Sequence, residues 1–270
     1  MGYKAMKHSN NPQTAKPDAT RPRYVLLDEL RGLAVIAMVV YHALFLLADV
    51  FGSPAGRALL YRAMPVQPFI AGTFILICGI CCRLSHSNLK RGLRLLGLAL
   101  LLTLSTYLLT FFGINEVILF GVLHFLAVAV LLFCLLEKPL AKVPPLPQIL
   151  LFAALFLATA HPLYNGPSGI GFGPWFLPFP RTDLLPLFFL GFPSRALGSA
   201  DYIPLIPWLF LFLAGTAIGT YARQGRFPAF FTKPRCAPLR WTGRHALVIY
   251  LLHQPVMFVL VTIYQWIFGG

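Results

Sequence analysis

The chain has 270 residues, of which 58% are hydrophobic and only 11% are charged, and its mean hydropathy is +0.74. About 25% of the residues in a soluble domain are charged, so this composition excludes an ordinary soluble protein and predicts a membrane protein. The formal net charge is +14, but the basic residues stand in short segments between apolar stretches. This distribution argues against nucleic-acid binding and favours topology signals and contacts with anionic membrane lipids.

In chain order, a polar segment precedes seven apolar ones. Residues 1–22 contain several Asn, Pro and Lys residues, which predicts a disordered cytoplasmic tail, and residues 23–270 are predicted to form one transmembrane domain. Seven apolar segments are long enough, or nearly so, to cross a bilayer, and the fifth is the weakest. They cover residues 31–51, 66–83, 93–112, 117–136, 147–162, 202–222 and 246–267. The sequence therefore predicts an all-α, polytopic helix bundle with about seven spans.

The Lys and Arg residues between the spans predict the orientation of the bundle. With the N-terminus in the cytoplasm, 18 of the 22 Lys and Arg residues fall in cytoplasmic segments and four fall outside. The positive-inside rule therefore predicts a cytoplasmic N-terminus. The Gly- and Pro-rich segment at about 163–201 then becomes an extracytoplasmic loop.

The cysteines agree with this orientation. All five lie at inner ends of spans or in a cytoplasmic loop, namely Cys78, Cys81, Cys82, Cys134 and Cys236. Because that side is reducing, we expect no disulfides. Cys78 and Cys81 form a C-x-x-C pattern, but inside an apolar helix this pattern favours packing. We expect no metal site.

One histidine stands inside the first span. The charged run at 27–32 opens directly into apolar residues, and His42 lies slightly outward of the middle of the span. An ionisable group in hydrocarbon is costly, so His42 is a functional candidate by default. Asp49 shares its helix face but is about 10 Å away along the axis. A carboxylate partner of His42 must therefore come from another span.

Further polar residues collect near the predicted outer boundary. His124 lies in the outer half of the fourth span, and His161 lies at the outer end of the fifth. Four carboxylates fall at or near the same boundary, those of Asp49, Glu116, Asp183 and Asp201. This predicts an outward-facing polar pocket to which His124 and Asp201 contribute as further catalytic candidates. For His124 and His161 the alternative is an ordinary interhelical hydrogen bond.

The predicted inner surface carries a basic cluster after the second span. Arg91 and Arg94 are three residues apart and share a helix face, and Arg83 precedes them. Such a pair can bind one phosphorylated ligand. The alternative is charge that only sets the topology.

Prolines interrupt two of the spans. Pro204 and Pro207 open the sixth, and Pro255 lies in the seventh beside His253 and Gln254. Broken backbone at membrane depth is tolerated where it lines a cavity, although a simple kink explains the prolines as well.

Five short motifs follow one another along the chain. They are Asp28-x-x-Arg31-Gly32 followed by His42, then residues 71–75, 120–124, 204–208 and 243–255. In this order they resemble bacterial proteins of the heparan-alpha-glucosaminide N-acetyltransferase-like catalytic domain family, over about residues 24–267. The first motif is also similar to that of membrane acyltransferases that modify cell-surface glycans.

The resemblance implies a polytopic acyltransferase that uses cytoplasmic acyl-CoA, with acetyl-CoA as the expected co-substrate, and modifies a sugar outside. It implies that His42 acts as a base or a transient acyl carrier, and that Arg91 and Arg94, with Arg83 nearby, bind the CoA end. We expect a multi-pass protein of the bacterial inner membrane, in contact with membrane lipids, with a glycan or glycolipid acceptor and no nucleic acid. Whether it forms a homo-oligomer is left open.

Two functions from other classes also fit the residues. A small proton-coupled transporter would use buried histidines and broken helices, although no inverted repeat is visible between the halves. A non-catalytic membrane scaffold would use the polar groups only for hydrogen bonds between helices.

Overall fold

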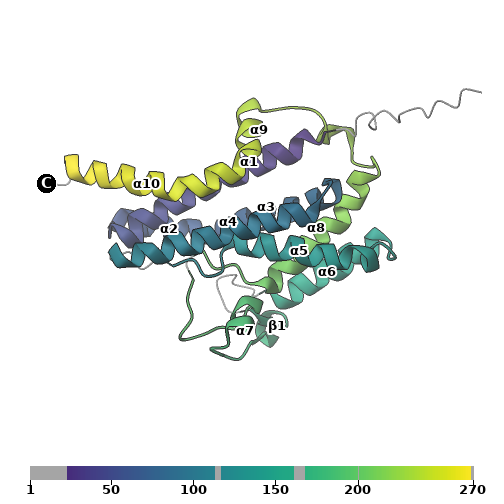
Figure 1. Ribbon diagram of the computed structural model, residues 1–270, viewed down its shortest axis with the longest axis horizontal. Helices are drawn as coiled ribbons and strands as arrows, with labels where there is room; N and C mark the ends of the chain where they lie inside the picture. The colour runs from purple at the N-terminus through teal and green to yellow at the C-terminus, as the bar shows by residue number, and fades with distance from the viewer. Residues whose placement is uncertain (1–22, 113–116, 161–167, 200, 269–270) are drawn as a thin grey trace, which may run out of the picture.

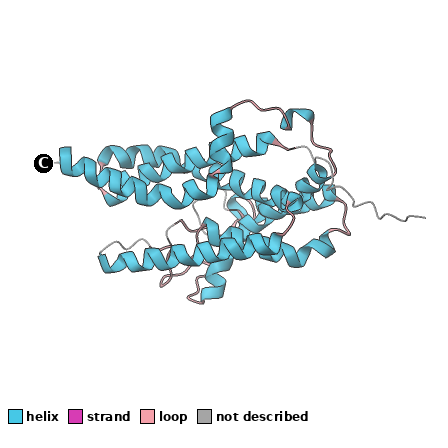
Figure 2. Cartoon of the chain, turned by 45° about the horizontal axis from the view of Figure 1, so that its top comes forward, coloured by secondary structure: helices cyan, strands magenta, loops and turns pink. Residues whose placement is uncertain are grey.

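Helices make up almost all of the regular structure in the computed structural model, which describes residues 23–112, 117–160, 168–199 and 201–268 (Figures 1 and 2). The predicted tail at 1–22, Glu116 and His161 lie outside the described residues. The α-helices are α1 (Val25–Phe45), α2 (Pro54–Ala63), α3 (Gln67–Leu84), α4 (Asn88–Leu109), α5 (Val122–Leu140), α6 (Pro145–Thr159), α7 (Leu185–Leu190), α8 (Leu205–Arg223), α9 (Ala237–Arg244) and α10 (Ala246–Phe268). A π-helical turn, η1 (Leu46–Val50), continues α1, and the strands β1 (Gly169–Ile170) and β2 (Leu177–Pro178) pair antiparallel.

Each of the seven predicted apolar segments coincides with a helix. Among the described residues, five helical runs are long and apolar enough to cross a membrane, namely Val25–Asp49, Pro54–Leu84, Asn88–Leu109, Val122–Leu140 and Leu205–Arg223. The two remaining apolar helices, α6 and the stretch Ala246–Leu260 of α10, are shorter. The mostly helical membrane fold is therefore confirmed, while the count of seven spans and the side of the N-terminus stay predictions.

Two segments between the predicted spans are partly helical. Helix α2 follows the first span, where the Ser53 side chain accepts a hydrogen bond of 3.1 Å from the Gly56 N–H and Pro54 occupies the first turn. A serine cap followed by proline is a favourable helix start. Helix α9 lies in the predicted cytoplasmic segment 223–245. Both helices are too short to be predicted from the length of an apolar segment.

Glycines bring α3 and α8 into close contact at the centre of the bundle. A Cβ atom on Gly79 of α3 would overlap the Phe212 carbonyl oxygen, and one on Gly215 of α8 would overlap the Leu76 carbonyl oxygen. Small residues at such positions let two membrane helices approach backbone to backbone. The largest fully buried side chains lie around this contact and on α5, among them Phe125, Phe133, Phe212 and Ile75.

One end of the bundle gathers the start of α1 with the ends of α3, α5 and α8. The Tyr24 hydroxyl donates to the Ala222 carbonyl over 2.7 Å. Arg83 at the end of α3 donates to Glu137 of α5 and to the Thr216 carbonyl of α8, both over 3.4 Å. The ends that the positive-inside count assigns to the cytoplasm therefore lie together.

Hydrogen bonds order the described part of the predicted outer loop. The Asp183 carboxylate accepts from the Ser194 hydroxyl over 2.7 Å and from the N–H groups of Arg195 and Ala196, and these bonds lower the pKa of Asp183. At the start of α8, Ile206 has non-helical dihedral angles, and its carbonyl accepts from the Ser168 hydroxyl over 2.7 Å. A loop residue therefore satisfies the backbone carbonyl at the proline-rich break in this span.

Candidate active site

A cavity of about 930 Å³ runs between the helices. It is lined by residues of α1, α3, α4, α5 and α10 and by the segment that leads into α8. Small-molecule and cofactor sites usually measure about 300–1,000 Å³, so this cavity lies at the upper end of that range. Its two ends carry different chemistry, histidines at one and arginines at the other.

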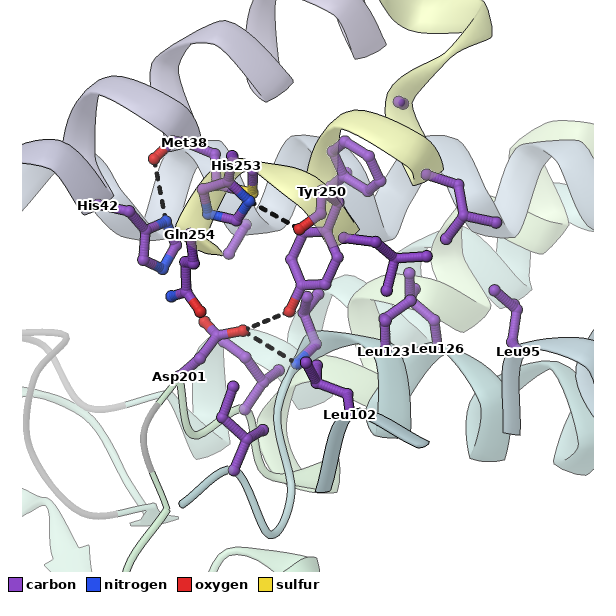
Figure 3. A pocket seen from close by; sticks show the side chains of 18 of the residues that line it. Met38, His42, Leu95, Leu102, Leu123, Leu126, Asp201, Tyr250, His253 and Gln254 are labelled. Atoms are coloured by element: carbon purple, nitrogen blue, oxygen red, sulfur yellow. Dashed lines mark hydrogen bonds between the residues drawn. The ribbon is translucent and has the colours of Figure 1, made fainter. Parts of the chain in front are cut away.

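His42 lines the first end of the cavity. Its Nδ1 lies 3.0 Å from the carbonyl oxygen of Met38, one helical turn earlier on α1 (Figure 3). A carbonyl only accepts hydrogen bonds, which assigns the proton to Nδ1. The Nε2 lone pair is then left for a substrate. The structure thus places His42 in the cavity, while its functional role stays a prediction.

His253 of α10 lies beside His42 at this end of the cavity, a placement that the sequence does not predict. The two ring centroids are 4.9 Å apart and the rings are tilted by 64°. His253 Nδ1 lies 2.7 Å from the Tyr250 carbonyl oxygen, and its buried Nε2 has no hydrogen-bond partner among the described residues. The same signal that singled out His42, an ionisable residue within an apolar span, applies to His253.

Asp201 closes this end of the cavity from the segment before α8. Its backbone φ is +52°, and its carboxylate accepts from the Tyr250 hydroxyl over 2.8 Å and from the Val122 N–H over 3.5 Å. Figure 3 shows the side chains of Asp201, Gln254 and His42 directed into the same space. The predicted polar pocket thus contains Asp201, together with Tyr250 and Gln254 from α10.

His124 is placed behind the cavity wall. Its Nδ1 accepts from the Gly121 N–H over 3.3 Å, and its Nε2 lies 2.9 Å from the Thr103 hydroxyl oxygen, whose own proton goes to the Ile118 carbonyl over 2.7 Å. The Nδ1 bond therefore caps the start of α5 itself, and the Nε2 contact joins α5 to α4. His124 does not line the cavity, and its contacts match the alternative of an interhelical hydrogen-bond partner.

Basic side chains line the other end of the cavity. They are Arg31, Lys90, Arg91, Arg94 and Arg244. Arg31 precedes His42 by 11 residues, which is about 16 Å along α1 at 1.5 Å per residue. The structure therefore brings the predicted pair Arg91 and Arg94 into the same cavity as His42, at a distance of several helical turns.

Three cysteines orient two of these arginines. Arg91 donates to Cys78 Sγ over 2.9 Å and to Cys82 Sγ over 3.7 Å, and Arg31 donates to Cys81 Sγ over 3.1 Å. Sulfur is a weak acceptor, so the guanidinium groups are positioned while keeping strong donors for a ligand. Among the described residues no group of three or more His, Cys, Asp or Glu side chains is arranged to hold a metal ion.

Arg83 has a different position from Arg91 and Arg94. It is 7% exposed, and its guanidinium lies over the Phe133 ring, 4.9 Å from the centroid, while bonding to Glu137 and to the Thr216 carbonyl. It does not line the cavity. These contacts join α3 to α5 and α8.

The acidic residues at the start of α1 hold α9 against the basic end. Glu29 Oε1 accepts from the N–H groups of Arg235 and Cys236 over 2.8 and 2.9 Å, where α9 begins. A Cβ atom on Gly243 of α9 would overlap the Asp28 carbonyl oxygen. The charged run at 27–32 is therefore a docking surface for α9, which brings Arg244 to the cavity.

Comparison with known proteins identifies the family. The family described as "Heparan-alpha-glucosaminide N-acetyltransferase, catalytic" matches residues 23–255. The chain belongs to this family. The match runs from the start of α1 to Pro255 in α10 and so includes both ends of the cavity, and the resemblance seen in the sequence is confirmed. This is a family of membrane acetyltransferases. No curated protein and no solved structure matches the chain.

Proposed function

We propose that the chain is a membrane-embedded acyltransferase that moves an acyl group, acetyl in the simplest case, from acyl-CoA to a hydroxyl or amine of an extracytoplasmic glycan. One observation carries this proposal. An imidazole side chain and a cluster of cationic side chains line the two ends of one cavity. Acyl-CoA has the complementary layout, with a reactive thioester joined to charged phosphates by the slender pantetheine arm.

His42 acts as the general base in this scheme. Its Nε2 takes the proton of the acceptor hydroxyl or amine while the acceptor oxygen or nitrogen attacks the thioester carbonyl carbon. The carbon–sulfur bond then breaks, and CoA leaves as a thiolate. The other route, in which Nε2 first carries the acyl group itself, uses the same lone pair.

The remaining lining residues position the two substrates. Arg91 and Arg94 bind the phosphates of CoA through charge-assisted hydrogen bonds. Asp201, held by Tyr250, and Gln254 supply polar groups for the acceptor. If the basic end faces the cytoplasm, as the Lys and Arg distribution predicts, the donor comes from the cytoplasm and the acceptor from outside. A bacterial inner membrane offers both compartments.

The test is acyl transfer by the purified protein with radiolabelled acetyl-CoA and two amphiphilic probes, octyl glucoside and octyl glucosaminide. The native protein is expected to label one of them. His42→Ala is expected to lose about 10²- to 10⁴-fold in rate, the usual contribution of a general base. The matched control is His86→Ala, because His86 is exposed and does not line this cavity. Equal rates with and without His42 would contradict the mechanism.

Ligand binding separates the enzyme from the transporter and scaffold alternatives. An enzyme of this design is stabilised by CoA, so its melting temperature in detergent rises with CoA concentration. A melting temperature that stays constant at millimolar CoA would contradict the proposal and favour the alternatives.

A further inference from the structure

Among the described residues that line the cavity, His253 has a buried side-chain nitrogen without a hydrogen-bond partner. It is only 7% exposed, yet its Nε2 is buried without a hydrogen-bond partner among the described residues. An unpaired buried acceptor costs about 1–3 kcal/mol, so such an atom calls for a functional explanation. Its other nitrogen is fixed, because Nδ1–H donates to the Tyr250 carbonyl over 2.7 Å.

His42 and His253 form a matched pair. Each has its Nδ1 proton held by a carbonyl of its own helix, three or four residues earlier, and each keeps an Nε2 lone pair. In Figure 3 the His253 nitrogen without a dashed line lies on the side of its ring that faces His42. No direct hydrogen bond joins the two Nε2 atoms. With ring centroids 4.9 Å apart, one bridging water can connect them and pass a proton between the rings.

The Nε2 lone pair of His253 can stabilise the charge that the proposed reaction places on His42. When His42 takes a proton it becomes an imidazolium at membrane depth, where a charge is costly unless other groups pair or hydrogen-bond with it. A neutral imidazole that accepts a hydrogen bond from the imidazolium spreads this charge. Two such rings share one proton, and a second proton is opposed by charge repulsion.

We propose that His253 is a second catalytic residue, which shares with His42 the proton taken from the acceptor. This inference rests on the proposed acyl transfer. The bond between the acceptor oxygen or nitrogen and the acyl carbon forms, the carbon–sulfur bond breaks, and the acceptor proton is held between the two Nε2 atoms. In water a thiol is a weaker acid than an imidazolium, so the leaving CoA thiolate takes the proton from the pair. Both histidines return to their neutral forms.

The substitution His253→Asn isolates the proposed role. The Asn side-chain amide places its NH₂ group where Nδ1–H stands, so it can still donate to the Tyr250 carbonyl. It has no atom at the position of Nε2. The variant is therefore expected to fold with the native melting temperature and to bind CoA normally, while kcat for acetyl transfer falls about 10²-fold or more.

A double-mutant cycle with His42→Ala separates a shared proton from a structural effect. Residues that act as a unit are non-additive, so His42→Ala/His253→Asn is expected to be no slower than His42→Ala alone. The inference is overturned if His253→Asn keeps kcat within threefold of the native value, or if the two losses multiply. Failure of the native protein to transfer acetyl from acetyl-CoA to octyl glucoside or octyl glucosaminide would overturn the proposed function and this inference together. Native activity with an unaffected His253→Asn variant would overturn this inference alone.

Discussion

The two ends of the cavity hold their functional side chains by different means. At the histidine end, His42 and His253 are fixed by backbone carbonyls of their own helices, and the buried Nε2 of His253 has no hydrogen-bond partner among the described residues. At the basic end, Arg91 is fixed by cysteine sulfurs on α3. The first arrangement provides reactive lone pairs. The second provides an oriented cation whose weak partners a phosphate can replace.

Because the two ends hold different groups, we expect substitutions at each end to change different kinetic constants. Substitutions at the histidine end are expected to change kcat and the kcat/KM for the acceptor. Changes at the basic end affect the Michaelis constant for acyl-CoA, because phosphate contacts are made equally in the ground state and the transition state. Four predictions test this division and the packing that supports it.

Arg91→Ala is expected to have the largest effect of the four. Hydrogen bonds to charged groups contribute about 1.5–3 kcal/mol, so KM for acetyl-CoA should rise about 10- to 100-fold with kcat nearly unchanged. Arg83→Ala is the matched control at the same end of the bundle, because Arg83 bonds to Glu137 away from the cavity. It should leave KM unchanged while lowering the melting temperature. Steady-state kinetics that show equal KM changes in both variants would contradict the assignment.

Gly243→Ala tests the packing of α9 on α1. The added Cβ meets the backbone oxygen of Asp28 rather than a movable side chain, so we expect a loss of about 2–3 kcal/mol in stability, as for an overpacked core. Gly97→Ala on α4 is the control. A Cβ atom there has no neighbour within 4 Å, and alanine favours the helix by about 0.5–1 kcal/mol. Melting in detergent measures both, and equal shifts would contradict the close contact.

Tyr250→Phe removes the hydroxyl that donates to Asp201 and leaves the ring in place. The carboxylate then loses its 2.8 Å partner in the acceptor part of the cavity. We expect kcat/KM for the acceptor to fall about 10-fold, within the range for a hydrogen bond to a charged group. KM for acetyl-CoA should stay constant, and a change in that constant alone would contradict the division between the two ends.

Glu29→Ala is expected to have the smallest effect. It removes the carboxylate that accepts from the Arg235 and Cys236 N–H groups at the start of α9. Losing such a cap costs about 1 kcal/mol, which a thermal melt in detergent can detect. Activity near the native level is expected below the melting transition, and an unchanged melting temperature would show that the cap contributes nothing.

Apolar length predicted most of the fold, and tertiary contacts decided most of the site. The apolar segments coincide with helices because hydropathy and span length are local properties. His42 was identified because an ionisable residue inside an apolar span is itself a signal. His253 carries the same signal, but beside Pro255 the sequence left a cavity lining and a simple kink equally open. Only the packing of α10 on α1 shows that it lies beside His42.

The arginines and His124 show why sequence position alone is insufficient. Arg83 ends the second predicted span and Arg91 follows it, yet Arg83 bonds to α5 while Arg91 lines the cavity, because the rotation of each helix sets the direction of its side chains. His124 was expected in the outer pocket from its depth. Its two ring nitrogens instead join Gly121 and Thr103, a pairing that depends on how α4 meets α5.

The most direct test of the proposed acyl-CoA binding mode is a cryo-electron microscopy structure of the protein in nanodiscs with acetyl-CoA bound. We predict density for the CoA phosphates within hydrogen-bond distance of Arg91 and Arg94, and the thioester at the other end of the cavity beside His42 Nε2. The cavity lies between α1, α4 and α10. Acetyl-CoA bound outside it, or bound in it with the phosphates beside His42 and the thioester beside the arginines, would contradict the proposal.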